Sequence, residues 1–458
     1  MDDTIAAIGT PIGAAGIGII RVSGKDAIEI VDRIFRSKNK KNLHQVPSHN
    51  IVYGHIVDEK GEVIDEVLVT VMLAPKSFTT ENVVEINCHG GTVAVRKTLE
   101  AVLKAGARLA EPGEFAKRAF LNGRIDLAQA ESIMDLINAK TAASLRVAVG
   151  QLEGKLSAQI KDIRAKLLEL RAHIEAGIDF PEHDIEDLSK EQIKVATVEL
   201  KSRIDKILES ADSGKILREG LKTVIIGKPN VGKSSLLNAL VKEKRAIVTD
   251  IPGTTRDVIE EFVSVRGIPL KILDTAGIRE TEDVVEKIGV QRSKEALEQA
   301  DFFLFVVDIA SEISSEDMEI AALLKGLSGI IIANKTDLTG GLNRDLQKEL
   351  GLDVPVVAMS LLNGQGLDEL EEKIVDIVYN NEFHSVDEIL VSNVRHERAL
   401  TAASEYLTGV LETLENNMPM DCVTIDLNSA WEELGKITGE TVGEDLLDQI
   451  FSQFCIGK

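Results

Sequence analysis

The sequence predicts an α/β domain with a parallel, doubly wound sheet, inserted into an all-α helical domain and preceded by an α+β domain. Apolar strands alternate with helices over residues 218–379, the pattern of parallel βαβ units. Residues 118–217 and 380–458 instead repeat apolar residues at helical spacing, and residues 1–117 mix short β-rich runs with Gly and Pro turns. We therefore expect four segments, of which the second and the fourth form one helical domain.

Charge and cysteine content narrow the classes of function. The chain of 458 residues has a formal net charge of −23 and a pI near 4.9. This balance disfavours a broad nucleic-acid-binding face, because nonspecific affinity comes from Lys and Arg neutralising phosphates; a local basic patch such as residues 33–41 is still compatible with it. Three cysteines fit a reducing compartment, and no apolar run approaches the roughly 18 residues of a membrane span. We expect a cytoplasmic protein that neither crosses a membrane nor carries a secretion signal.

The first two segments are expected to contain recognisable elements. In the N-terminal domain, β-rich runs lie at 16–22, 51–57, 66–73 and 83–87, and helical patterns lie at 26–35 and 92–105. In the helical domain, the apolar residues that recur at helical spacing are Ile163, Leu167, Leu170, Ile174, Val195, Val198, Ile204 and Ile207. Such stripes predict long amphipathic helices.

A phosphate-binding loop opens the α/β domain. Residues 227–234 read Gly-Lys-Pro-Asn-Val-Gly-Lys-Ser and lie between an apolar strand at 221–226 and a helix at 235–241. The glycines let backbone N–H groups close around phosphate oxygens, Lys233 reaches the outer phosphates, and the Ser234 hydroxyl ligates Mg²⁺. The N-terminus of the following helix favours an anion. This order of strand, loop and helix predicts nucleotide binding.

Two further segments are expected to contact the γ-phosphate and Mg²⁺. The strand at 270–273 is followed by Asp-Thr-Ala-Gly. In this segment the Asp274 carboxylate can hold Mg²⁺ through water, and Gly277 can donate its N–H to the γ-phosphate. Thr255, within Gly-Thr-Thr-Arg-Asp (253–257), is the candidate for a second hydroxyl on Mg²⁺.

Guanine specificity is predicted from the segment that follows the strand at 329–333. It reads Asn-Lys-Thr-Asp, and the Asp337 carboxylate can accept hydrogen bonds from guanine N1–H and the exocyclic amine, which adenine cannot match. A later strand, 354–359, leads to Ser360, whose backbone N–H is expected at guanine O6. In this order the motifs predict a Ras-like P-loop GTPase domain. The expected GTP-binding residues are Asn230, Val231, Gly232, Lys233, Ser234, Ser235, Thr249, Thr254, Thr255, Asp274, Thr275, Ala276, Gly277, Asn334, Lys335, Asp337 and Ser360.

Two residues distinguish this domain from signalling GTPases. Ile278 stands where those enzymes carry a water-positioning glutamine, so another group must orient the attacking water. The carboxylates of residues 279–286 are candidates, with an acidic helix start as the alternative. In the phosphate loop, the Asn230 side-chain oxygen can hold a monovalent cation together with three backbone carbonyls, those of Thr249, Ile251 and Thr254. Such a cation would do the work of an arginine finger.

Four segments outside these motifs carry a family resemblance. They are residues 77–81 (Ser-Phe-Thr-Thr-Glu), 88–91 (Cys-His-Gly-Gly), 111–131 and 454–458 (Phe-Cys-Ile-Gly-Lys). Together with the GTPase motifs they make the whole chain resemble the MnmE (TrmE) family of bacterial and organellar tRNA modification GTPases. A Cys-Ile-Gly-Lys tail joined to such a GTPase is a highly specific combination.

This resemblance implies a potassium-stimulated GTPase that acts with the partner protein MnmG. Together they add an aminomethyl or carboxymethylaminomethyl group to C5 of the wobble uridine of certain tRNAs. The implied cofactors are Mg²⁺, K⁺ and a methylene- or formyl-tetrahydrofolate, with FAD and NADH on MnmG. The resemblance also implies a homodimer formed through an N-terminal domain of tetrahydrofolate-binding type, and a heterotetramer or larger complex with MnmG.

The resemblance further implies roles for particular residues. Asn230 becomes a potassium ligand, Glu286 the residue that orients the attacking water, and Lys233 part of the catalytic set. Cys455 is expected to have a chemical role, with a purely structural thiol as the alternative. The folate contacts fall on four charged residues, which suits a pterin that needs a carboxylate and a glutamate tail that needs cations. They are Arg21, Glu81, Arg124 and Lys458, each of which would otherwise be an ordinary surface charge.

Two other functional classes stay open at this point. A ribosome-assembly GTPase shares the signature at 253–257 and an aliphatic residue after the Asp-x-x-Gly motif. Such proteins usually carry a basic RNA-binding module, for which this sequence has no candidate. A regulatory switch without chemistry of its own predicts slow hydrolysis that needs a separate activator protein. Fast intrinsic turnover in K⁺ would exclude that class.

Overall fold

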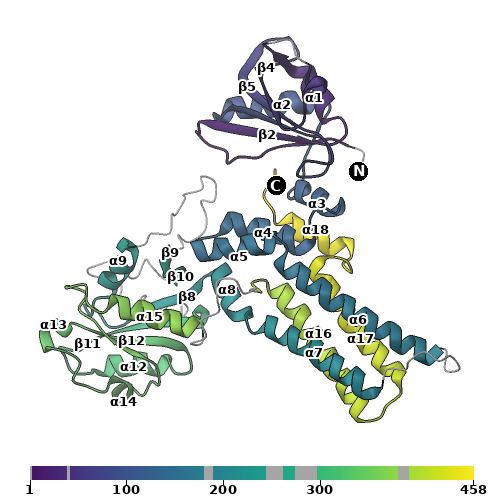
Figure 1. Cartoon of the computed structure of the whole chain (residues 1–458). Helices are drawn as coiled ribbons and strands as arrows, with labels where there is room; N and C mark the ends of the chain where they lie inside the picture. The colour runs from purple at the N-terminus through teal and green to yellow at the C-terminus, as the bar shows by residue number, and fades with distance from the viewer. Residues whose placement is uncertain are drawn as a thin grey trace.

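The computed structural model describes residues 3–38, 42–179, 189–243, 261–273, 297–379 and 391–457. Figure 1 shows three bodies: an N-terminal sheet with its helices, a group of long helices, and an α/β body beside them. The arrangement confirms the predicted fold class.

The N-terminal domain is a seven-stranded sheet with two main helices. The strand order is β3-β4-β5-β6-β2-β1-β7, and the paired strands are antiparallel except for β1 with β7. The strands are β1 (Ile5–Ile8), β2 (Ile17–Ser23), β3 (Phe35–Ser37), β4 (Asn50–Val57), β5 (Val63–Met72), β6 (Val83–His89) and β7 (Arg108–Leu109). The helices are α1 (Ala27–Ile34), α2 (Thr92–Lys104) and the short 3₁₀ helix Leu43–Gln45. The expected strands and helices are confirmed, whereas β1, β3 and β7 were not predicted.

The helices cover one face of this sheet. Along β5, Val67, Val69 and Val71 are buried in the same core as residues of α1 and α2, whereas Leu68 between them is exposed. Successive side chains of a strand point to opposite faces, so this alternation identifies one covered face and one open face.

The helical domain combines segments from both sides of the α/β body. Its helices are α4 (Leu127–Asn138), α5 (Ala142–Leu152), α6 (Lys155–Asp179), α7 (Lys190–Leu208), α8 (Ala211–Glu219), α16 (Val394–Glu415), α17 (Met420–Thr438) and α18 (Glu444–Ser452); α3 (Glu114–Leu121) precedes them. One hydrophobic core runs from Ala128 to Ile437 and includes residues of α6, α7, α16 and α17. Among the described helices, none has both the length and the apolar character that crossing a membrane requires.

The apolar stripe of α7 differs from the predicted one. Val195 and Val198 are 60% and 47% exposed. The face that packs into the core is formed by Ile193, Thr197, Leu200, Ile204 and Ile207. The two valines match helical spacing in sequence but lie on the solvent side, because helical neighbours three and four residues apart define more than one stripe.

A charged cluster lies within the helical domain, between α4 and α16. Glu131 accepts hydrogen bonds from His396 Nε2 at 2.8 Å and from Arg395 Nη2 at 2.6 Å. Burial raises the pKa of Glu131, but the hydrogen bond and charge of His396, together with Arg395, outweigh it and lower the pKa to about 2. The cluster therefore links a helix that precedes the α/β body with one that follows it.

The α/β body is a six-stranded sheet of order β13-β12-β11-β8-β10-β9, parallel except for the edge pair β9–β10. Its strands are β8 (Leu221–Ile226), β9 (Glu261–Val265), β10 (Ile268–Leu273), β11 (Phe302–Asp308), β12 (Ser328–Asn334) and β13 (Val356–Ala358). Its helices are α9 (Lys233–Glu243), α12 (Ser315–Leu323), α13 (Thr336–Thr339), α14 (Leu346–Leu350) and α15 (Leu367–Val378).

Both faces of this sheet are covered by helices. In β11, Phe302, Leu304 and Val306 belong to a core shared with α9 and α15, while Phe303, Phe305 and Val307 belong to one shared with α12 and α14. A strand buried on both faces reads as a continuous apolar run, which is why the sequence predicted a doubly wound sheet correctly.

Candidate functional site

The phosphate loop lies at the carboxyl end of β8, and close approach of other strands shapes it. Gly227 has φ +152°, and a Cβ there would lie 2.3 Å from the Val306 carbonyl oxygen. Gly232 has φ +110°, and a Cβ there would lie 2.4 Å from Asn334 Nδ2. Only glycine fits these two positions, so the loop stays close to β11 and β12 with its backbone free to face an anion.

Lys233 begins α9 and points back over the loop. Its Nζ donates to the carbonyl oxygens of Gly227 at 2.6 Å and Lys228 at 2.8 Å. Burial lowers the pKa of the Lys233 ammonium. The ammonium is thus held at the mouth of the loop, where it can exchange loop carbonyls for phosphate oxygens.

The residues predicted to recognise the base follow β12 and β13. Asn334 is buried, and its Nδ2 donates to the Val231 carbonyl oxygen at 2.7 Å. The Ser360 hydroxyl donates to Asp337 Oδ1 at 2.6 Å, and Lys335 Nζ donates to Asp308 Oδ2 at 2.6 Å. Asn334 therefore couples the base-binding segment to the phosphate loop, and Ser360 orients the carboxylate that is expected to meet guanine. Ligands of open α/β sheets bind at this carboxyl edge.

Several predicted residues lie outside the described part of the chain, so the structure says nothing of their placement. They are Thr249, Ile251, Thr254, Thr255, Asp274, Thr275, Ala276, Gly277, Glu286 and Lys458. Of the expected metal ligands, Ser234 is half-buried at the start of α9, and Asn230 is exposed in the loop with φ +61°. Within the described ranges, no three His, Cys, Asp or Glu residues gather as a metal site.

A second cluster forms where the C-terminal tail meets the N-terminal domain. Arg21, on β2, donates from Nη1 to the Gly457 carbonyl oxygen at 3.0 Å across 436 residues of sequence. Gly457 has φ +91°, and a Cβ there would lie 2.3 Å from the Ile8 carbonyl oxygen. The exposed Cys455 accepts a hydrogen bond from the Gly113 N–H through its carbonyl oxygen. Figure 1 shows the C-terminus below the N-terminal sheet, beside α3.

Arg21 and another folate candidate, Arg124, both lie against the segment of residues 77–81. Arg124 donates to the Phe78 carbonyl oxygen at 2.8 Å, and its guanidinium lies 5.0 Å from the Phe78 ring centroid. The Arg21 guanidinium lies 6.0 Å from the same centroid. The structure therefore brings Arg21, Arg124 and the tail together around Phe78, a residue whose role the sequence did not indicate.

Two residues that sequence reasoning missed hold Glu81 in place. Glu81 Oε2 accepts a hydrogen bond from Ser23 Oγ at 2.6 Å, and Oε1 accepts one from Arg118 Nη1 at 3.1 Å. Arg118 is only 1% exposed and also pairs with Glu114 and Asp3. Its place inside the segment 111–131 was the one available signal, but only the fold shows that it faces Glu81.

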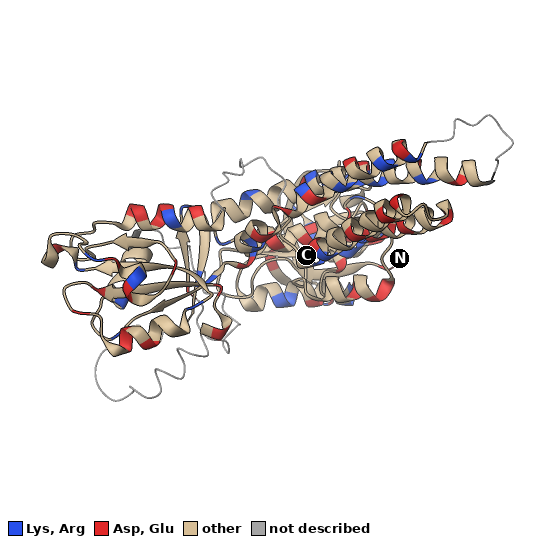
Figure 2. Ribbon diagram, turned by 90° about the horizontal axis from the view of Figure 1, so that it is seen from below, with Lys and Arg blue, Asp and Glu red and all other residues tan. Residues whose placement is uncertain are grey.

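Surface charge is mixed on the long helices. Figure 2 shows basic and acidic residues interspersed along them, without one uninterrupted basic face in that view. The absence of such a face in this view agrees with the expectation drawn from the net charge of −23, which disfavours a broad basic surface.

Comparisons with known proteins cover the whole chain. Residues 4–124 match the family model for the GTP-binding protein TrmE N-terminus, and residues 127–455 match that for the MnmE helical domain. The chain is 54% identical over 459 residues to the tRNA modification GTPase MnmE of Alkaliphilus metalliredigens, covering 100% of both chains. It is 55% identical over 458 residues to that of Geobacillus kaustophilus, covering 100% of this chain and 99% of the relative. Among solved structures, Era of Aquifex aeolicus is 30% identical, covers 40% of this chain and 65% of its own, and has a TM-score of 0.28.

Proposed function

This chain belongs to the MnmE (TrmE) family of tRNA modification GTPases, and on that premise we propose which chemistry its two sites perform. As a member of the family it is an enzyme that hydrolyses GTP and acts in tRNA modification. We propose that hydrolysis is stimulated by K⁺. We further propose that, with the FAD- and NADH-using protein MnmG, the chain adds an aminomethyl or carboxymethylaminomethyl group to C5 of the wobble uridine. The added carbon would come from a methylene-tetrahydrofolate.

The observation that carries the folate part is the grouping of Arg21, Arg124 and the tail at Gly457 around Phe78, with Glu81 three residues further along the same segment. Its chemistry suits a folate. The Glu81 carboxylate can accept from the pterin amine and ring N–H, the guanidinium groups can pair with the glutamate tail, and the Phe78 ring offers an apolar face. The Gly457 contact brings the described end of the tail to this cluster, and Cys455 lies two residues before it in sequence. We assign a further folate contact to Lys458.

At the GTP site, the chain's own residues have separate tasks. Lys233 neutralises the outer phosphates, while Asn334 and Ser360 hold the guanine-binding residues in register with the loop. The donors present fit hard cations: the Ser234 hydroxyl suits Mg²⁺, and the Asn230 side-chain oxygen suits K⁺. When bound, these ions supply positive charge to the transferred phosphoryl group. We assign orientation of the attacking water to Glu286.

The proposal includes an organisation for the chain. Residues 1–117 are the tetrahydrofolate-binding and dimerisation domain, 218–379 the GTPase domain, and 118–217 with 380–458 the helical domain. The working form is a cytoplasmic homodimer in complex with MnmG and tRNA. The contact between Arg21 and Gly457 supports a role of the helical domain's end in the folate site.

The test is nucleoside mass spectrometry of bulk tRNA from cells that lack this chain, complemented with variants. Wild type should restore the C5-aminomethyl-type uridines. Gly457→Val should not, since a side chain at φ +91° meets the Ile8 carbonyl oxygen, whereas the control Gly443→Ala should, because its Cβ would meet nothing within 4 Å. An unchanged nucleoside profile in the deletion strain would remove the wobble-uridine assignment, and ribosome assembly would be examined next.

A further inference from the structure

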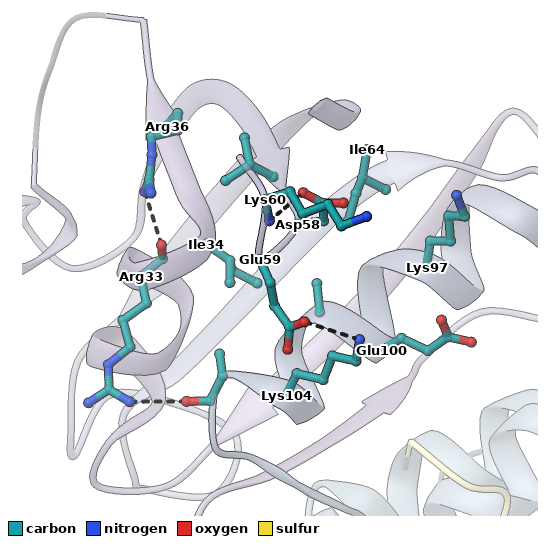
Figure 3. Close-up of a pocket in the computed structure, with 13 residues that line it drawn as sticks. Arg33, Ile34, Arg36, Asp58, Glu59, Lys60, Ile64, Lys97, Glu100 and Lys104 are labelled. Atoms are coloured by element: carbon teal, nitrogen blue, oxygen red, sulfur yellow. Dashed lines mark hydrogen bonds and ion pairs between the residues drawn. The ribbon is translucent and has the colours of Figure 1, made fainter. Parts of the chain in front are cut away.

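A charged hollow lies in the N-terminal domain, lined by none of the residues assigned to GTP or folate. Its volume is about 540 Å³, and it is bordered by the end of α1 with β3, the turn between β4 and β5, and α2. Figure 3 shows the side chains that line it. Five of them are basic: Arg33, Arg36, Lys60, Lys97 and Lys104.

The three carboxylates of the hollow are already engaged. Asp58 Oδ1 accepts from the backbone N–H groups of Lys60 at 2.9 Å and Glu62 at 2.8 Å. Glu59 pairs with Lys104 at 3.5 Å, and Glu100 pairs with Arg96 of its own helix at 3.6 Å. One acid therefore stabilises the turn, and the other two are matched by a cation each.

Three of the cations have no carboxylate partner within the described ranges. Arg36 Nη1 donates only to the carbonyl oxygens of Arg33 and Phe35, both at 3.0 Å. Lys60 and Lys97 make no side-chain hydrogen bond or ion pair with any residue that the structure describes. All three side chains are exposed, so their positive charge faces solvent unneutralised.

The excess of positive charge at the hollow contrasts with the acidic character of the whole chain. Residues 1–117 contain 14 Lys and Arg against 15 Asp and Glu, although the whole chain carries −23. In the sequence, residues 33–41 contain five basic residues and no acidic one, and two of them, Arg33 and Arg36, line the hollow. The hollow is thus the part of a local basic region that the fold makes concave.

The arrangement of the unpaired cations favours a ligand with several phosphates. Arg36 lies on β3, Lys60 in the turn between β4 and β5, and Lys97 on α2, so the three charges come from three separate elements around the hollow. Successive phosphates of a polynucleotide can pair with charges that are distributed in this way. Exposed lysines on a shaped surface also match how proteins hold RNA backbones, by charge and shape more than by base identity.

We propose that this hollow is a docking site for the phosphate backbone of RNA, occupied by the tRNA that the enzyme modifies. The identity of the RNA rests on the proposed function, but the phosphate chemistry rests on the residues above. The site contributes a few contacts at one place, which is compatible with an acidic chain.

The test measures binding of unmodified tRNA to the full-length protein by fluorescence anisotropy over a range of salt concentrations. The double variant Lys60→Gln/Lys97→Gln removes two phosphate contacts. Each contact contributes roughly 0.7–0.9 to the slope of log affinity against log salt. The variant should therefore bind about tenfold more weakly near physiological salt, with a slope smaller by about 1.5.

The matched control is Lys206→Gln/Lys325→Gln, which changes the net charge equally at two exposed lysines, one in α7 and one after α12, that also have no carboxylate partner within the described ranges. It should bind tRNA as wild type does, and GTP turnover should be normal in both double variants. Equal affinities for all three proteins would mean that the hollow takes a small anion or none, and would overturn the proposal. Equal weakening in both double variants, or no tRNA binding by wild type, would overturn it as well. Nucleoside mass spectrometry of the deletion strain tests the proposed function separately.

Discussion

A buried ion pair between the phosphate loop and α12 allows a quantitative prediction. Lys228, the second residue of the loop, donates from Nζ to Asp317 Oδ2 at 2.9 Å. Asp317 is fully buried and also accepts from the Ser314 N–H at 2.9 Å and the Ser314 hydroxyl at 2.7 Å. Replacing Lys228 by Met would keep an unbranched side chain of nearly the same length, without the ammonium group, and leave the carboxylate with Ser314 alone.

The expected loss of stability follows from the burial of the ion pair. Removing one partner of a buried ion pair costs about 3–5 kcal/mol. Two features reduce this figure: the Lys228 side chain is 18% exposed, and Ser314 still donates two hydrogen bonds. We expect Lys228→Met to lower the free energy of opening the α/β sheet by about 2–3 kcal/mol, or roughly 30- to 150-fold in the opening constant.

The assay is hydrogen exchange of the buried amides in β8, β11 and β12, which reports the opening of this sheet separately from the other domains. The double variant Lys228→Met/Asp317→Asn should recover part of the loss, because it leaves no buried charge unpaired. Exchange of Lys228→Met at the wild-type rate would refute the reasoning. So would strictly additive effects of the two substitutions.

The ion pair between Lys228 and Asp317 also makes the stability difference between wild type and Lys228→Met depend on pH. Burial raises the pKa of Asp317, but hydrogen bonds from Lys228 and Ser314 outweigh it, so the pKa lies below its ordinary value of 3.8. A lowered carboxyl pKa contributes stability above that ordinary value, and the contribution is lost as pH falls through the folded-state pKa. The difference between wild type and Lys228→Met should therefore shrink below about pH 4.

Three further predictions concern hydrolysis and the helical domain. Asn230→Ala and Asn230→Gly should both abolish the preference of GTP turnover for K⁺ over Na⁺. The glycine variant is the control for the positive φ of this position. An unchanged ratio of the turnover rates in K⁺ and Na⁺ would contradict the potassium role. Glu286→Ala should slow turnover while a fluorescent GTP analogue binds normally, and normal turnover would rule that role out. For Glu131, with a pKa of about 2, the stabilisation of the helical domain should be complete above about pH 4.5 and be lost as pH falls toward 2. Denaturant unfolding followed by the fluorescence of Trp431, the sole tryptophan, measures this, and Glu131→Gln should abolish that part of the pH dependence.

The fold of the GTPase domain was largely predictable, because the motifs and apolar runs that indicate it are contiguous in sequence. The alternation of apolar strands with helices over residues 218–379 indicated a parallel sheet covered on both faces, and the loop at 227–234 lies where the sequence predicted it, between β8 and α9. The Gly227 and Gly232 positions could be read as functional because each needs a backbone that other residues rarely adopt. Local periodicity failed where two stripes compete: only packing against neighbouring helices decided that Val195 and Val198 face solvent.

The sequence by itself determined the fold class, the order of the domains and the presence of a guanine-nucleotide site, since these follow from contiguous residues and their periodicity. Only the tertiary structure decided that the tail at Gly457 lies on Arg21, that Ser23 and Arg118 hold Glu81, and that Lys60 and Lys97 border one hollow. The physical reason is that these contacts join side chains distant along the chain. Their partners, burial and net charge exist only after the sheet and helices have packed.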